Sequence, residues 1–114
     1  PSAIYANSDF VANSPEAVEL YLSALWKQHA RINENASYLA ELASEHLGGS
    51  VGEWQGIARR YAEAGLFDAN ALNEENLAYT IRFFEDAGTI EPGLTPDQIA
   101  NLELVRSAAA SLDR

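Results

Sequence analysis

Apolar residues recur about every 3.6 positions along most of this sequence, which is the spacing of amphipathic α-helices. The triplet Ser14-Pro15-Glu16 combines a side-chain acceptor for the first amides, a proline that needs no amide hydrogen and an acid at the positive end of the helix dipole. We therefore expect a helix to begin near Ser14 and to give way around Asn33 to Asn35. Its apolar stripe consists of Val18, Leu22, Leu25, His29 and Ile32.

A second and a third helix are expected directly after the first. The second carries an apolar stripe up to Gly48-Gly49, which ends a helix in the usual C-terminal manner. Its members are Leu39, Leu42, Ala43 and His46 or Leu47. The third begins at the capping box Ser50-Val51-Gly52-Glu53 and runs toward Gly65. Its apolar face consists of Trp54, Ile57, Ala58 and Tyr61.

Two more helices complete the pattern. Asn73 can cap a fourth, aromatic-rich helix that ends before Gly88. The run Thr95-Pro96-Asp97-Gln98 again combines a cap, an N1 proline and an N3 glutamine, so we expect one final helix to follow it. The stripe of this last helix is Leu102, Val105, Ala109 and, at its end, Leu112.

The segment Ala3 to Ala6 is the one predicted strand, because it is short and contains β-branched and aromatic residues. A lone strand leaves its backbone groups unpaired, and the sequence offers no partner for it. The predicted fold class is therefore mostly α, with about five helices and one short N-terminal strand. We interpret residues 1–114 as a single domain or as a domain fragment of a larger protein.

Composition narrows the possible partners. The chain has 114 residues, of which 47% are hydrophobic, and this is enough for one modest core. Its net charge is −10 and it contains only seven Lys and Arg residues, which argues against binding to nucleic acid or to anionic membrane surfaces. No apolar run reaches the roughly 18 residues of a membrane span, and the N-terminus lacks the layout of a signal peptide.

Candidate catalytic and metal-binding residues are few. His29 and His46 lie on different predicted helices without a cysteine nearby, which is not the spacing of a zinc site. Glu74-Glu75 and Glu85-Asp86 are neighbours in sequence, but adjacent helical residues point about 100° apart and do not converge on one substrate atom. We therefore expect no catalytic residue, no metal and no cofactor, and we predict that the chain is not an enzyme.

One cluster combines positive charge with aromatic character. Arg59 and Arg60 follow Trp54 closely in the sequence. An arginine can hold a carboxylate or sulfonate through its fork of donors, and an aromatic wall can cover the apolar part of the same ligand. The alternative is that both arginines pair with acids at the surface. Trp54, Arg59 and Arg60 are the candidate ligand-binding residues.

Four segments together resemble a known family. They are Y-A-N-S-D-F-V-A-N-S-P-E-A-V, I-N-E-N-A-S-Y-L-A-E-L-A-S-E-H-L-G, L-N-E-E-N-L-A-Y-T-I-R-F-F-E-D-A-G-T-I and L-T-P-D-Q-I. They are similar to the C-terminal part of periplasmic substrate-binding proteins of nitrate, sulfonate and taurine ABC importers, a family that also includes binders of thiamine pyrimidine precursors. In that family a strand followed by a Pro-Glu helix start opens a long helix, and a late helix ending in Asp/Glu-Ala-Gly precedes a Leu-Thr-Pro turn.

The resemblance implies that the chain is about the last third of a two-lobed α/β periplasmic-binding-protein fold. Such a protein closes on a small anionic or polar solute by hinge motion and delivers it to an ABC permease. Periplasmic localisation follows from the resemblance alone. The family's ligand contacts come largely from regions that precede the matching segments, so the resemblance assigns none of them to residues of this chain.

Two alternatives remain open at this point. The chain is either this fragment of a solute-binding protein or a self-contained helical domain that binds a partner protein through a groove. On the fragment interpretation, apolar side chains that would cover an absent sheet are left open, and we expect the fragment to associate as a homodimer.

Overall fold

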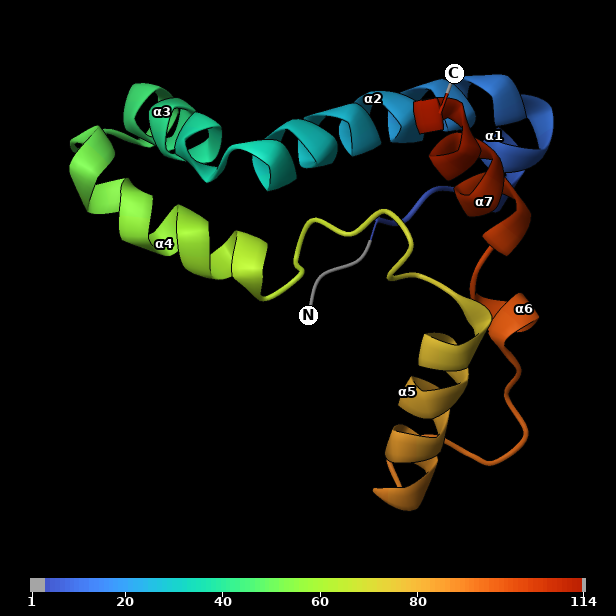
Figure 1. Ribbon diagram of the computed structural model, residues 1–114. Helices are drawn as coiled ribbons and strands as arrows, with labels where there is room; N and C mark the ends of the chain where they lie inside the picture. Colours follow the sequence, from blue (N-terminus) through green and yellow to red (C-terminus); the bar gives the residue numbers. More distant parts are fainter. Residues whose placement is uncertain (1–3, 114) are drawn as a thin grey trace. The chain divides into compact units, whose positions relative to one another are not determined.

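The chain folds into helices whose connections are short except at residues 64–73 and 87–95. The computed structural model describes residues 4–113, and within that range it is mostly helical and contains no strand (Figure 1). The helices, in chain order, are α1 (Ser8–Asn13), α2 (Pro15–Glu34), α3 (Ala36–Leu47), α4 (Val51–Glu63), α5 (Glu74–Asp86), α6 (Pro96–Ile99), α7 (Leu102–Ala110) and the short 3-10 helix η1 (Ser111–Asp113).

The chain divides into two compact units. One is Ala24–Ala69, which contains the second half of α2 together with α3 and α4. The other comprises residues 4–23 and 70–113 of the described chain and contains the first half of α2 with α1, α5, α6 and α7. The chain therefore passes between the units twice, once inside α2 and once after Ala69.

A helical hairpin dominates the first unit. Helices α3 and α4 pack against each other. The buried residue of α3 is Ala40 and that of α4 is Ala58, and such small side chains allow two helix backbones to approach closely. The turn between the helices contains Gly48 and Gly49, whose φ angles of 82° and 83° favour glycine over residues with a Cβ atom. The hydroxyl of Ser44 donates to the Gly49 carbonyl at 2.7 Å and holds this turn on the end of α3.

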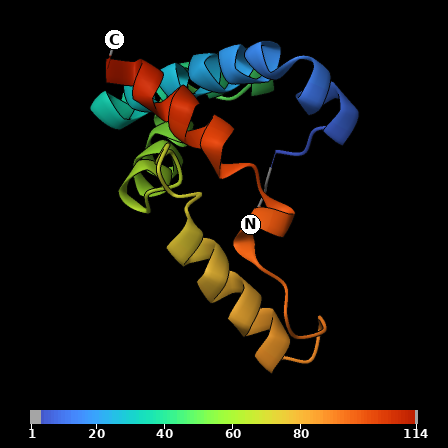
Figure 2. The same cartoon turned by 90° about the vertical axis from the view of Figure 1, so that its right-hand side faces the viewer.

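In the second unit, α7 lies beside the first half of α2 in both views (Figure 2). Ser107 on α7 donates from its hydroxyl to the Glu19 carboxylate on α2 at 2.7 Å. The hydroxyls of Ser23 and Ser111 share a hydrogen bond of 2.9 Å. Val105 and Ala108 form the buried face of α7. These contacts join residues that are far apart in the sequence.

The predicted helix starts are confirmed. Helix α2 begins at Pro15, and the carbonyl of Ser14 accepts the amides of Ala17 and Val18. The Asn73 side chain caps α5 by accepting the amide of Asn76 at 2.9 Å. At α4 the capping box is complete, and at α6 the Gln98 side chain accepts the Thr95 amide at 2.9 Å.

Three details of the sequence prediction are wrong. Ile4 to Ala6 do not form a strand, because no strand exists within residues 4–113 to pair with them; Ala3 lies outside the described residues. Helix α1 was not expected, although Asn7 marks its start by accepting the amides of Asp9 and Phe10 at 2.9 and 3.3 Å.

The third wrong detail is the single final helix that was expected after Thr95. It is interrupted, because Ala100 is extended, with φ −144° and ψ 140°. Asn101 then starts α7 afresh by accepting the amide of Leu104 at 3.2 Å. A side chain that bonds a nearby backbone amide offers the chain an alternative to a continuous helix. The apolar stripe continues across this interruption, so the sequence pattern alone predicts one uninterrupted helix.

Candidate functional site

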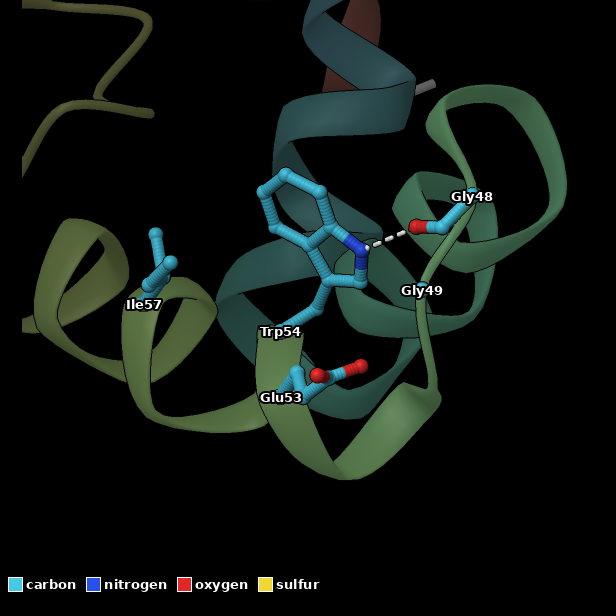
Figure 3. Close-up of a pocket in the computed structure, with 5 residues that line it drawn as sticks. All are labelled: Gly48, Gly49, Glu53, Trp54 and Ile57. Carbon is cyan, nitrogen blue, oxygen red and sulfur yellow. Dashed lines mark hydrogen bonds between the residues drawn. The ribbon is translucent and has the colours of Figure 1, made fainter.

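Trp54 lies at the start of α4 and turns back over the glycine turn. Its indole Nε1 donates a hydrogen bond of 2.7 Å to the carbonyl oxygen of Gly48 (Figure 3). The ring is half-buried, and a Cβ atom added to Gly49 would lie only 3.2 Å from Nε1. The indole is therefore held by the end of the α3–α4 hairpin, and its one polar atom is already used.

Arg59 and Arg60 do not join Trp54 in one site. On a helix with about 100° per residue they lie about 140° and about 240° around the axis from Trp54. Both are exposed, and Arg60 donates from Nε to the carbonyl of Gly56 within its own helix at 3.3 Å. The three residues predicted to bind a ligand therefore share a helix and lie on different faces of it.

A shallow depression of about 250 Å³ adjoins Trp54 (Figure 3). It is lined by Gly48, Gly49, Glu53, Trp54 and Ile57. The indole and Ile57 give it an apolar wall, and the Glu53 carboxylate gives it one charged edge. The sequence pattern predicts that Trp54 and Ile57 share one apolar face. It does not predict that Gly48 and Gly49 line the same depression, because their position depends on how α3 and α4 pack together.

The Glu53 carboxylate is committed to the helix start. Its Oε2 accepts the Ser50 amide at 2.6 Å and the Ser50 hydroxyl at 2.9 Å. The Ser50 amide, and secondly the hydroxyl, lower the pKa of Glu53 because both bonds favour the ionised form. The depression can therefore receive an apolar group beside the indole, while the Glu53 carboxylate remains bonded to Ser50 in the capping box.

A second cluster was not recognised from the sequence. His29, on the second half of α2, lies between the rings of Trp26 and Phe67, with ring centroids 5.2 and 5.3 Å apart. Its Nδ1 and the Nε1 of Trp26 are buried and have no hydrogen-bond partner within residues 4–113. The predicted stripe includes His29 but not Trp26, although the two are three residues apart on one helix. Phe67 comes from a distant segment that no local pattern indicates.

Residues 4–113 contain neither a group of metal ligands nor a helix suited to a membrane. Within residues 4–113, no three His, Cys, Asp or Glu side chains come together as a group that could hold a metal ion. His46 lies in the last turn of α3, at the end of the helix where a positive charge is favoured. None of the helices in the described range has the length and apolar character needed to cross a membrane.

Comparison with known proteins returned no match, whether with family models, with curated proteins or with solved structures.

Proposed function

We propose that this chain forms the C-terminal helices of the solute-binding component of an ABC importer. The solute would be small and anionic or polar, of the sulfonate, taurine or nitrate kind. In such a protein the chain performs no chemistry. It forms part of a lobe that closes on the solute and then docks on the permease.

The exposure of large apolar side chains is the observation that carries this proposal. Among residues 4–113 no large side chain is fully buried. Large hydrophobic residues on six different helices are instead open to solvent, although a domain that folds for itself normally buries most of them. They include Leu20 and Tyr21 on α2, Tyr61 on α4, Tyr79 and Phe83 on α5 and Ile99 on α6. Helices that cover a sheet contributed by the rest of a larger fold would have such faces.

The positions of the helix starts give further support. The Pro-Glu start of α2, the end of α5 before Gly88 and the Leu94-Thr95-Pro96 turn before α6 occur where the family resemblance expects them. These features form caps and turns, so they support the fold of the parent protein. The identity of the solute rests on the resemblance.

A helical protein-interaction domain is the second candidate. The same exposed side chains favour it, because an apolar helix face can also receive a partner protein. On this alternative the partner would cover Tyr79 and Phe83, and no small solute would bind. The two functions therefore differ in what the complete protein binds.

Isothermal titration calorimetry on the full-length product of the gene distinguishes them. The titrants are taurine, an alkanesulfonate, nitrate and a thiamine pyrimidine precursor. We expect saturable, stoichiometric heat with one of these solutes and loss of binding when the solute is replaced by an uncharged analogue of similar size. A full-length protein that binds none of the four would overturn the proposal and leave the interaction domain.

A further inference from the structure

His29 occupies an unusual position for a residue that can carry charge. It is half-buried on α2, with the Trp26 ring tilted against it at 47° and the Phe67 ring meeting it edge-on at 66°. Its Nδ1 is buried without a partner in the described part of the chain. A neutral imidazole can leave one nitrogen unprotonated at modest cost, whereas an imidazolium must place a donor on both.

Phe67 is held on α2 at two points. Its ring contacts His29, and its carbonyl oxygen accepts a hydrogen bond of 2.8 Å from the side-chain amide of Asn33. His29 and Asn33 are four residues apart and therefore lie on the same face of α2. Ala69, two residues beyond Phe67, is buried. Phe67 thus lies against the second half of α2, within the unit Ala24–Ala69.

The electrostatic surroundings of His29 favour the neutral ring. Burial lowers the pKa of His29 below its ordinary value. On α2, none of the neighbours that share its face carries a charge; they are Leu25, Trp26, Ile32 and Asn33.

The charged residues to consider around His29 belong to α2 and to residues 66–69. Lys27 and Arg31 are two residues before and after His29, on other sides of the helix, and the Arg31 guanidinium lies 4.1 Å from the centre of the Tyr38 ring. Asp68 follows Phe67 and is the acid that the segment brings to this region. It makes interactions of its own.

We propose that His29 is the proton-sensitive element of a latch, in which the neutral imidazole holds residues 66–69 on α2 and protonation releases them. Protonation would place an additional donor on Nδ1, which is buried and has no acceptor within residues 4–113. Phe67 lies outside the helices, and its contacts with α2 include the ring of His29 and the hydrogen bond from Asn33. The release needs no solute, so the latch is separate from the proposed transport role.

The latch lies directly before one of the two points where the chain passes between the units. Residues 66–69 lead directly to the point after Ala69 where the chain leaves this unit. Of the two passages between the units, the one inside α2 is a continuous helix. The passage after Ala69 is irregular, and Phe67 lies two residues before it.

Tryptophan fluorescence can follow the latch because the chain has only two tryptophans and two histidines. In a Trp54→Phe background the emission comes from Trp26, and a protonated imidazole quenches a neighbouring indole more strongly than a neutral one. We expect a reversible loss of emission as the pH falls from about 7.5 to about 5, with a midpoint below the ordinary histidine value of about 6.5. Over the same range, the Asn33 side-chain amide should lose its protection from hydrogen exchange.

Two variants decide the assignment. His29→Gln, which cannot titrate in this range, should abolish both transitions, and His46→Gln, at an exposed helix end, should leave both unchanged. If His29→Gln fails to fold, the Asn33 exchange measurement in the unchanged protein still decides the question. The latch is overturned if the transitions persist in His29→Gln, disappear in His46→Gln, or if Asn33 keeps its protection after Trp26 has been quenched.

Discussion

The indole Nε1 of Trp54 donates a hydrogen bond of 2.7 Å to the carbonyl oxygen of Gly48. The bond spans the turn that joins α3 to α4. This bond connects the second helix of the hairpin to the end of the first. Trp54→Phe retains most of the ring and removes the donor, so the unfolding free energy should fall by about 1 kcal/mol. Urea denaturation followed by circular dichroism measures the change. An unchanged midpoint would show that the bond contributes nothing to the hairpin.

Two glycines near Trp54 should respond in opposite directions to alanine. Gly49→Ala places a Cβ atom 3.2 Å from Trp54 Nε1 and from the Glu53 carboxylate, at a φ of +83°. It should destabilise the protein by about 1–2 kcal/mol, because left-handed backbone strains a residue with a Cβ atom.

Gly56→Ala is the matched control for that variant. It lies inside α4, where nothing stands within 4 Å of an added Cβ atom, and it should stabilise the protein by about 0.5–1 kcal/mol. Thermal melts of the two variants, compared with the unchanged chain, test both signs together. Equal shifts in one direction would contradict the geometry of the turn.

The capping box makes stability depend on pH in the acid range. Because the Ser50 bonds lower the pKa of Glu53 in the folded protein, the ionised carboxylate stabilises the fold at pH values above the unfolded pKa of about 4.3. This contribution is lost as the pH falls through the folded pKa. Glu53→Gln should therefore flatten the dependence of the urea midpoint on pH below about 4.3. A dependence as steep as that of the unchanged chain would refute this role of Glu53.

Local hydrogen bonds explain which helix starts could be predicted from the sequence. Ser50 and Asn73 accept amides only three residues away, so the residues that form each bond also stand together in the sequence. Asn101 makes the same kind of bond, but the apolar stripe continues across it and favoured one helix where the structure has two.

Contacts between distant segments could not be predicted in this way. The expected strand at Ala3 to Ala6 depended on a partner strand, and nothing in a short segment reports whether one exists. The predicted apolar stripe includes His29, whereas the contact of His29 with Phe67 depends on the path of the chain after α4. For the same reason Trp54, Arg59 and Arg60, which are close in sequence, were grouped although the helix separates their faces.

The exposed aromatic side chains predict self-association. Phe83 is 60% and Tyr79 66% exposed on α5, and apolar surface of this kind tends to find a partner. The charge of −10 on each copy opposes a dimer, so added salt should strengthen the association by screening the repulsion. Sedimentation equilibrium at low and high salt measures the effect, with Phe83→Asp as the weakened variant. A monomer under both conditions would contradict the prediction.

Calorimetric titration of the 114-residue chain itself tests the proposed function most directly. A cleft between two lobes buries its ligand from both sides, and one part of the cleft alone lacks the opposing contacts and the exclusion of water. The account predicts that the chain binds the solute of the full-length protein at least about a thousandfold more weakly, which corresponds to a loss of roughly 4 kcal/mol. Tight, stoichiometric binding by this chain would contradict the account and place the site within these helices, and Trp54, which lines the depression, would be the first residue to replace.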